Sequence, residues 1–150
     1  MIIPKLPQPS PKALVEQTIG ITDVKVSYAR PSVKGRTIFG HLVPFGSIWR
    51  TAANAGSYIS FDGPVIIAGT SVPAGQYALL AVPGPKEWTV MLNKATKSIL
   101  AAPYDERENV ASFQLPVQQV GFVETFTIGF EQLSTDAAGL FLAWETTKVS

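Results

Sequence analysis

The sequence lacks cysteine altogether and contains a single histidine, His41. Without cysteine there is no disulfide, thiol nucleophile or thiolate metal ligand, and redox chemistry gives no indication of the cellular compartment. One histidine cannot complete the four-ligand set of a structural zinc site. The acidic run YDERE at 104–108 lacks the spacing of a calcium-binding loop, and no GxGxxG or P-loop motif occurs. We therefore predict no metal and no cofactor.

Charged residues are also scarce, at 15% of the chain, against about 25% in an average soluble domain. The formal net charge is +1, whereas proteins that neutralise phosphates have a strong basic excess, so we expect no nucleic-acid partner. No apolar run approaches the roughly 18 residues of a transmembrane helix. The N-terminal MIIPKLPQPSPKA has four prolines and no long apolar segment. It predicts an extended arm over 1–12, followed by one domain over 13–150.

Short segments with alternating polar and apolar residues recur along the rest of the chain. In TDVKVSYA, Val24, Val26 and Tyr28 alternate with Lys25 and Ser27, which is the pattern of a half-buried strand. Further apolar or alternating segments are ALVEQTIG, SYISF, PVIIAG, GQYALLAVP, EWTVMLN, NVASFQLPV, GFVETFTIGF and AGLFLAWETTKV, beginning at residues 13, 57, 64, 75, 87, 109, 121 and 138.

Turn residues separate these segments, since twelve glycines and twelve prolines are spread through the chain. Asp62-Gly63 predicts a tight hairpin between SYISF and PVIIAG. The irregular region 93–109 has room for a short helix. Seven to nine short strands without an amphipathic helix predict an all-β fold, an antiparallel β-sandwich of jelly-roll type, with a barrel as the alternative.

A long irregular loop is predicted between the early strands, from Arg30 to Asn54, with room for one helical turn. Loops of this length inside a domain are usually functional or packed by their own side chains. From Val24 to Phe61 the chain carries five Lys or Arg residues and no acid, whereas after Leu100 it carries seven Asp or Glu residues. We expect these two regions to neutralise each other in the fold.

This loop and the strand before it supply candidate ligand-binding residues. The planar guanidinium group of arginine can donate hydrogen bonds to a carboxylate or a phosphate, and lysine adds a point charge. Asparagine offers both a hydrogen-bond donor and an acceptor. Tyrosine and tryptophan rings offer faces for stacking. Such a mixture is typical of a pocket for a small polar or anionic ligand, such as a saccharide or a carboxylate. The candidates are Tyr28, Arg30, Lys34, Arg36, Trp49, Arg50 and Asn54.

Three other roles stay open. The arginines can donate hydrogen bonds to backbone carbonyls of the loop, and the loop would then be a structural plug inside the protein. The proline-rich arm and free strand edges can mediate self-association into a homo-oligomer. A hydrolase or lyase working through Tyr28, His41 or Asp105 is the least favoured, because no motif establishes a nucleophile and base pair. In particular, the GxSxG pattern is absent, since Val72 and Pro73 follow Ser71.

Several phrases match one family in order and spacing, namely SPKALVEQTIGITDVKVSYARPSVKGRTIFG, LVPFGSIWRTAAN, PAGQYALLAVPGPKEWTVMLNK and LFLAWETTKVS. From about Ser10 to the C-terminus the chain resembles the bacterial family catalogued as domain of unknown function 2911. The resemblance implies a β-rich, secreted or periplasmic domain that is often made with a leader, and no established activity. The family pattern after the tryptophan reads Gly-Ala-Asn-Glu-Ala-Thr. Here Ala52 replaces the glycine, and Asn54 is followed by Ala55 instead of the acid. If that acid is a general acid or base in relatives, this chain lacks the role, and if it pairs with an arginine, that arginine is free here for another partner.

Overall fold

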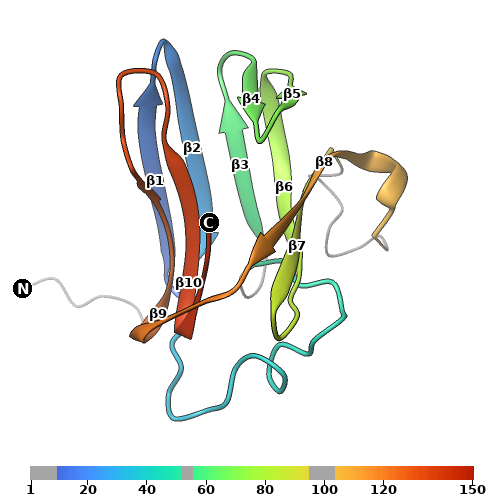
Figure 1. The fold of residues 1–150 in the computed structure, drawn as a ribbon, viewed down its shortest axis with the longest axis vertical. Coiled ribbons are helices and arrows are strands. Elements are labelled where there is room, and N and C mark those ends of the chain that lie inside the picture. The colour runs from blue at the N-terminus through green and yellow to red at the C-terminus, as the bar shows by residue number, and fades with distance from the viewer. Residues whose placement is uncertain (1–9, 52–55, 95–103) are drawn as a thin grey trace, which may run out of the picture.

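The structure is a computed structural model that describes residues 10–51, 56–94 and 104–150 (Figure 1). The strands are β1 (Lys12–Ile19), β2 (Thr22–Ala29), β3 (Ser57–Phe61), β4 (Val65–Ile67), β5 (Thr70–Val72), β6 (Gly75–Val82), β7 (Glu87–Asn93), β8 (Asn109–Pro116), β9 (Gln118–Glu131) and β10 (Gly139–Val149). A 3-10 helix, η1 (Glu106–Glu108), precedes β8 and fulfils the prediction of a short helix in this region. None of the described residues forms a helix long and apolar enough to cross a bilayer.

The strands form one large antiparallel sheet and two hairpins. The large sheet has the order β1-β2-β3-β6-β7-β8, β9 pairs with β10, and β4 pairs with β5. In Figure 1 the long β9–β10 hairpin crosses one face of the large sheet and forms a second layer. The predicted all-β sandwich is therefore confirmed. The alternative barrel does not form, because β1 and β8 are the two edges of an open sheet.

The alternating pattern of the strands places the core between the two layers. Val24, Val26 and Tyr28 of β2 are buried, while Lys25 and Ser27 between them are exposed. From β9 and β10 the buried side chains Phe126, Ile128, Leu142 and Trp144 pack against the same core. The part of β6 from residue 77 to 81 is buried on both faces, and Ala78 and Leu80 on its outer face form a second buried cluster with Met91 of β7.

The β9–β10 hairpin bends sharply near Glu145. This residue has a φ of 58°, and the register of the two strands shifts on both sides of it. Beyond the bend the last residues of β10 turn back along the hairpin (Figure 1). The Lys148 ammonium consequently lies 2.6 Å from the Glu131 carboxylate and 4.9 Å from the centre of the Phe141 ring. Val149 is fully buried.

The hairpin predicted at Asp62-Gly63 is wrong. Strand β3 pairs with β2 and β6, whereas β4 pairs only with β5. Pro64 has no amide hydrogen to donate to a returning strand, and the Asp62 carboxylate instead accepts a hydrogen bond from the Asp23 amide at 2.7 Å. The tight turn lies at Ala68-Gly69, whose φ values of 47° and 83° are both positive, as type I′ hairpin turns require.

The predicted long loop is present, although residues 30–51 contain no helical turn. After β2 the chain leaves the large sheet and forms an antiparallel bridge to β9 between Ser32 and Thr125. It returns to the large sheet through a bridge between Trp49 and Ala81 of β6. The loop thus links the two layers at one end of the sandwich. The proline-rich arm lies outside the described residues apart from Ser10, Pro11 and the first residue of β1.

Candidate functional site

The two ends of the sandwich are built differently. We call the end that carries residues 30–51 the closed end, and it lies at the bottom of Figure 1. We call the opposite end the open end, where the β1–β2, β4–β5 and β9–β10 turns lie (Figure 1). The predicted ligand-binding residues that the structure describes belong to the closed end or to β2, which leads into it.

At the closed end, Arg30 and Arg36 donate their side-chain hydrogen bonds mostly to backbone carbonyls. Arg30 Nε donates to the Phe126 carbonyl and its Nη2 to Thr127 Oγ1, both at 3.0 Å. Arg36 Nε donates to the Val33 carbonyl at 2.9 Å and its Nη2 to the Ser32 carbonyl at 2.6 Å. These bonds hold the loop to β9 and to itself, which is the arrangement that an internal plug requires.

Acids from the C-terminal half reach this loop, but through its backbone. Glu124 of β9 accepts a hydrogen bond from the Lys34 amide, and Glu145 of β10 accepts one from the Ile38 amide, both at 3.0 Å. The expected neutralisation between the two halves therefore takes a different form. Among the described residues the ion pairs are Lys148 with Glu131 and Arg107 with Asp105, all of them after residue 100.

The aromatic candidates lie against other rings. Trp49 stacks on Trp144 at 6.2 Å between ring centres with an interplanar angle of 14°, and it meets Phe39 and Trp88 edge-on. Tyr28 is buried, contacts Phe126 edge-on, and donates from its hydroxyl to the Ile128 carbonyl at 3.3 Å. Both rings thus contribute packing area to the core, and Trp49 remains half-buried.

Arg50, Lys34 and Asn54 complete the predicted set. The half-buried Arg50 guanidinium makes no hydrogen bond or ion pair with any other residue that the structure describes. The Lys34 side chain is exposed on a backbone with a φ of 51°. Asn54 lies outside the described residues. The structure therefore brings Tyr28, Arg30 and Trp49 into the packed body and leaves Arg50 with its donors available.

The residues considered for catalysis are dispersed. Tyr28 lies in β2, the exposed His41 lies in the loop, and Asp105 caps η1. No hydrogen bond joins any two of these three residues. The Arg107 guanidinium donates to the Asp105 carboxylate at 3.1 and 3.0 Å and holds the pKa of that carboxyl below its ordinary value. Within the described residues there is no cluster of three or more His, Asp or Glu side chains suited to a metal.

The open end contains a pocket of about 750 Å³. Its wall combines side chains from β1, β2, β3, β4, β5, β9 and β10, including Ile59, Val65 and Leu140. Of the 17 lining residues, the ones with polar side chains are Thr22, Ser71 and Asp136. The pocket is thus an apolar hollow with a few polar groups, and nothing in the sequence analysis located it.

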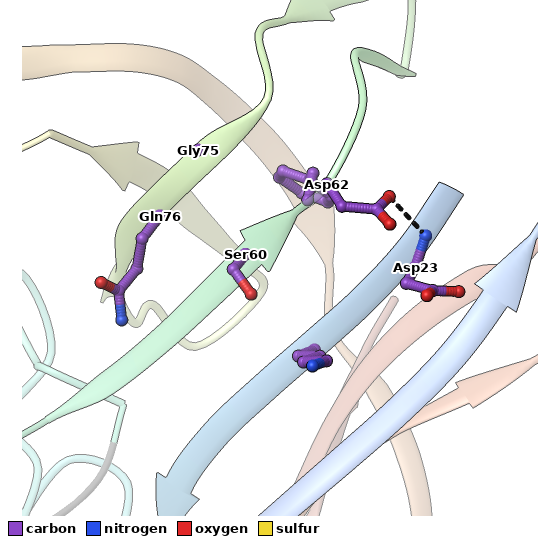
Figure 2. A pocket seen from close by; sticks show the side chains of 7 residues that line it. Asp23, Ser60, Asp62, Gly75 and Gln76 are labelled. Carbon is purple, nitrogen blue, oxygen red and sulfur yellow. Dashed lines mark hydrogen bonds between the residues drawn. The ribbon is translucent and has the colours of Figure 1, made fainter. Parts of the chain in front are cut away.

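A second hollow, of about 400 Å³, lies on the outer face of the large sheet and is lined mainly by polar residues (Figure 2). Asp23, Lys25, Ser60 and Gln76 line it from β2, β3 and β6, and Figure 2 shows the Asp62 carboxylate directed at the Asp23 amide. The Asp23 carboxylate in turn accepts from Thr18 Oγ1 at 2.7 Å. Phe61 lines both hollows, but Asp23 and Lys25 lie on the outer face of the large sheet, whereas Val24, which lines the first pocket, lies on its inner face.

Comparison with known proteins gives one match. A family model described as protein of unknown function (DUF2911) matches residues 10–150. The chain belongs to the DUF2911 family. Curated proteins and solved structures give no match to this DUF2911 chain. The family resemblance seen in the sequence is therefore confirmed from residue 10 to residue 150.

Other residues that hold the closed end of this DUF2911 chain were not predicted. Thr51 is fully buried in a left-handed conformation with a φ of 56°, which is rare for a β-branched residue. Its hydroxyl lies 2.8 Å from the carbonyls of Arg50 and Leu79. Glu124 was recognisable as the one acid among the apolar positions of its strand. Thr51 carried no comparable signal.

Proposed function

We propose that this protein is a small-molecule-binding module and that the pocket at the open end is its binding site. The observation that carries the proposal is the pocket itself, with its volume of about 750 Å³ and its predominantly apolar wall. Ligand sites typically have volumes of about 300 to 1,000 Å³, apolar walls and a small number of placed polar groups. This site replaces the loop as the leading candidate and keeps the binding function predicted from the sequence.

The rim of the pocket supports the same proposal. Ile21 in the β1–β2 turn is 100% exposed and Ile66 in β4 is 75% exposed, and both line the pocket. Aliphatic side chains that remain in water add no hydrophobic stabilisation to the fold. A ligand that covers them gains roughly 25 cal/mol for each Å² of apolar surface removed from water.

A small polar or anionic ligand at the closed end is the second candidate. Arg50 favours it, because its guanidinium is half-buried and its donors are not used by other described residues. Lys34 and Arg36 add positive charge on the exposed side of the same loop. The test is a thermal-shift screen of sugars and organic acids with the wild type and Arg50→Ala. A shift present in both proteins, or in neither, argues against this site.

Self-assembly is the alternative of a different class. Strand β1 is an edge of the large sheet, and Leu14 on it is 63% exposed, so the edge could accept a strand from a second copy. Removing residues 1–11 should then change the molar mass measured by light scattering. A monomer before and after the deletion would count against assembly.

We also propose that the protein acts outside the cytoplasm, as a secreted or periplasmic domain, because the family resemblance implies it. Fractionation of cells that express the complete gene with its native upstream sequence tests this location. Recovery from the cytosol alone would refute it.

The main proposal is tested by filling the pocket. Ala138 lines it, whereas Ala74 in the β5–β6 turn does not. We expect Ala138→Trp to abolish the binding of small apolar probes seen by calorimetry with the wild type, because the indole occupies the pocket. Ala74→Trp adds the same ring elsewhere and should leave binding unchanged. Equal binding by both variants would show that the probes bind at another place.

A further inference from the structure

The apolar pocket at the open end has a negatively charged side chain at its mouth. Asp136 is the one charged residue among those lining the pocket, and it is exposed in the β9–β10 turn. It faces the β1–β2 turn, since a Cβ added at Gly20 would lie 3.8 Å from the Asp136 Cα. Its carboxylate makes no hydrogen bond or ion pair with another described residue. A free carboxylate therefore stands at the mouth of an apolar pocket.

None of the described residues that line the pocket carries a positive charge. Two further acids, Asp23 and Asp62, line the hollow on the outer face of the sheet (Figure 2), where their carboxylates accept hydrogen bonds from Thr18 Oγ1 and from the Asp23 amide. Lys25 is the one cation that lines this hollow. Glu131 at the end of β9 is already paired with Lys148 at 2.6 Å.

Resting on the function proposed above, we infer that the pocket takes a cationic amphiphile, a molecule with an apolar chain and a positively charged amine. The chain fills the apolar hollow and the ammonium group lies at the mouth beside Asp136. An anionic amphiphile of the same chain length would place its carboxylate beside the Asp136 carboxylate. Two unit charges about 5 Å apart in water interact with about 0.8 kcal/mol, so reversing the sign of the head group changes the affinity by about tenfold.

The test uses three probes with one chain, namely octan-1-ol, octylammonium and octanoate, and isothermal titration calorimetry at low ionic strength. We expect octanol to bind, and octylammonium to bind about tenfold more tightly than octanoate. Asp136→Asn should bring the affinities of the two charged probes to within about threefold while octanol binds as before. Glu106→Gln, which removes an exposed acid in η1, is the matched control and should preserve the preference.

The outcomes distinguish a failure of the charge selectivity from a failure of the binding function. If octanol binds but octylammonium is not preferred over octanoate, the charge selectivity is overturned and the binding function stands. If none of the three probes binds, the binding function fails and the selectivity fails with it. If the preference survives in Asp136→Asn, or is lost equally in Glu106→Gln, then Asp136 does not select the head group.

Discussion

The two ends of this sandwich treat their side chains in opposite ways. At the closed end, two arginines, the buried threonine and two glutamates are hydrogen-bonded within the protein. Two rings of the loop, Phe39 and Trp49, pack on Trp144 and Trp88. At the open end, isoleucines stand in water and a carboxylate has no partner among the described residues. In this domain an arginine-rich and aromatic-rich segment is mainly structural, while aliphatic side chains from several strands line the candidate site.

The largest effect should come from Arg30 at the closed end. Arg30→Ala removes two hydrogen bonds made by a charged donor and leaves the Phe126 carbonyl without this partner. We expect the free energy of unfolding, measured in urea, to fall by about 3 kcal/mol. Lys34→Ala is the control, because that side chain is exposed and its loss should change stability by less than about 0.5 kcal/mol. Equal stabilities of the two variants would show that the Arg30 hydrogen bonds do not hold the closed end together.

The tryptophans under the loop allow a finer comparison. Trp88 and Trp144 are each 2% exposed. Trp144 Nε1 donates to the Glu124 carbonyl at 3.1 Å, whereas Trp88 Nε1 has no hydrogen-bond partner in the part of the chain that the structure describes. Replacement by phenylalanine removes similar volume at both sites. We expect Trp144→Phe to lower the free energy of unfolding by about 1 kcal/mol more than Trp88→Phe. A larger loss for Trp88→Phe in the same urea titration would contradict this account.

The open end should respond in the opposite sense. Ile21→Ser and Ile66→Ser change side chains that are already in water, so we expect stability to stay within about 0.5 kcal/mol of the wild type. Binding of an apolar probe to the pocket should weaken in both variants, because they line it. Calorimetry and urea titration of the same preparations separate the two effects. A loss of stability as large as that of Arg30→Ala would mean that these residues serve the core.

The smallest effect is expected at a place that belongs to neither end. Arg107 is exposed and lowers the pKa of Asp105 by its hydrogen bonds. Because the folded pKa is depressed, the pair stabilises the protein above the ordinary pKa of an aspartate, and this contribution is lost as the pH falls through the folded value. Arg107→Ala should raise the pKa of Asp105 in an NMR titration and change the melting temperature very little. A large drop in melting temperature would show that the pair does more than cap η1.

The sequence predicted most of the fold, because strand periodicity is local. Val24, Val26 and Tyr28 are buried as their alternation requires. The turn after β3 was mispredicted because Asp62-Gly63 has the residues of a hairpin, whereas the hairpin that forms has Ala68 at a position where alanine is uncommon. At Asp62-Gly63 the local preference for a hairpin turn is overridden, because β3 pairs with β6 and not with β4.

The candidate site was much harder to predict, because its determinants are not local. The sequence shows that Arg30 is a donor, but its acceptor on Phe126 lies 96 residues away, and no pattern within the loop could locate that partner. The pocket at the open end gathers side chains from seven strands in the same way. Its one visible sign in the sequence is Ile21, an isoleucine in a turn where polar residues are more usual.

The bend at Glu145 has a practical consequence for anyone who engineers this chain. Because β10 folds back there, the last strand residue, Val149, reaches the interior and is fully buried. A fusion partner joined directly after it would pull against a side chain in the core, and a truncation that removes it would leave an empty space lined by apolar groups. Affinity handles and fluorescent labels therefore belong ahead of β1, or behind a generous linker after Ser150.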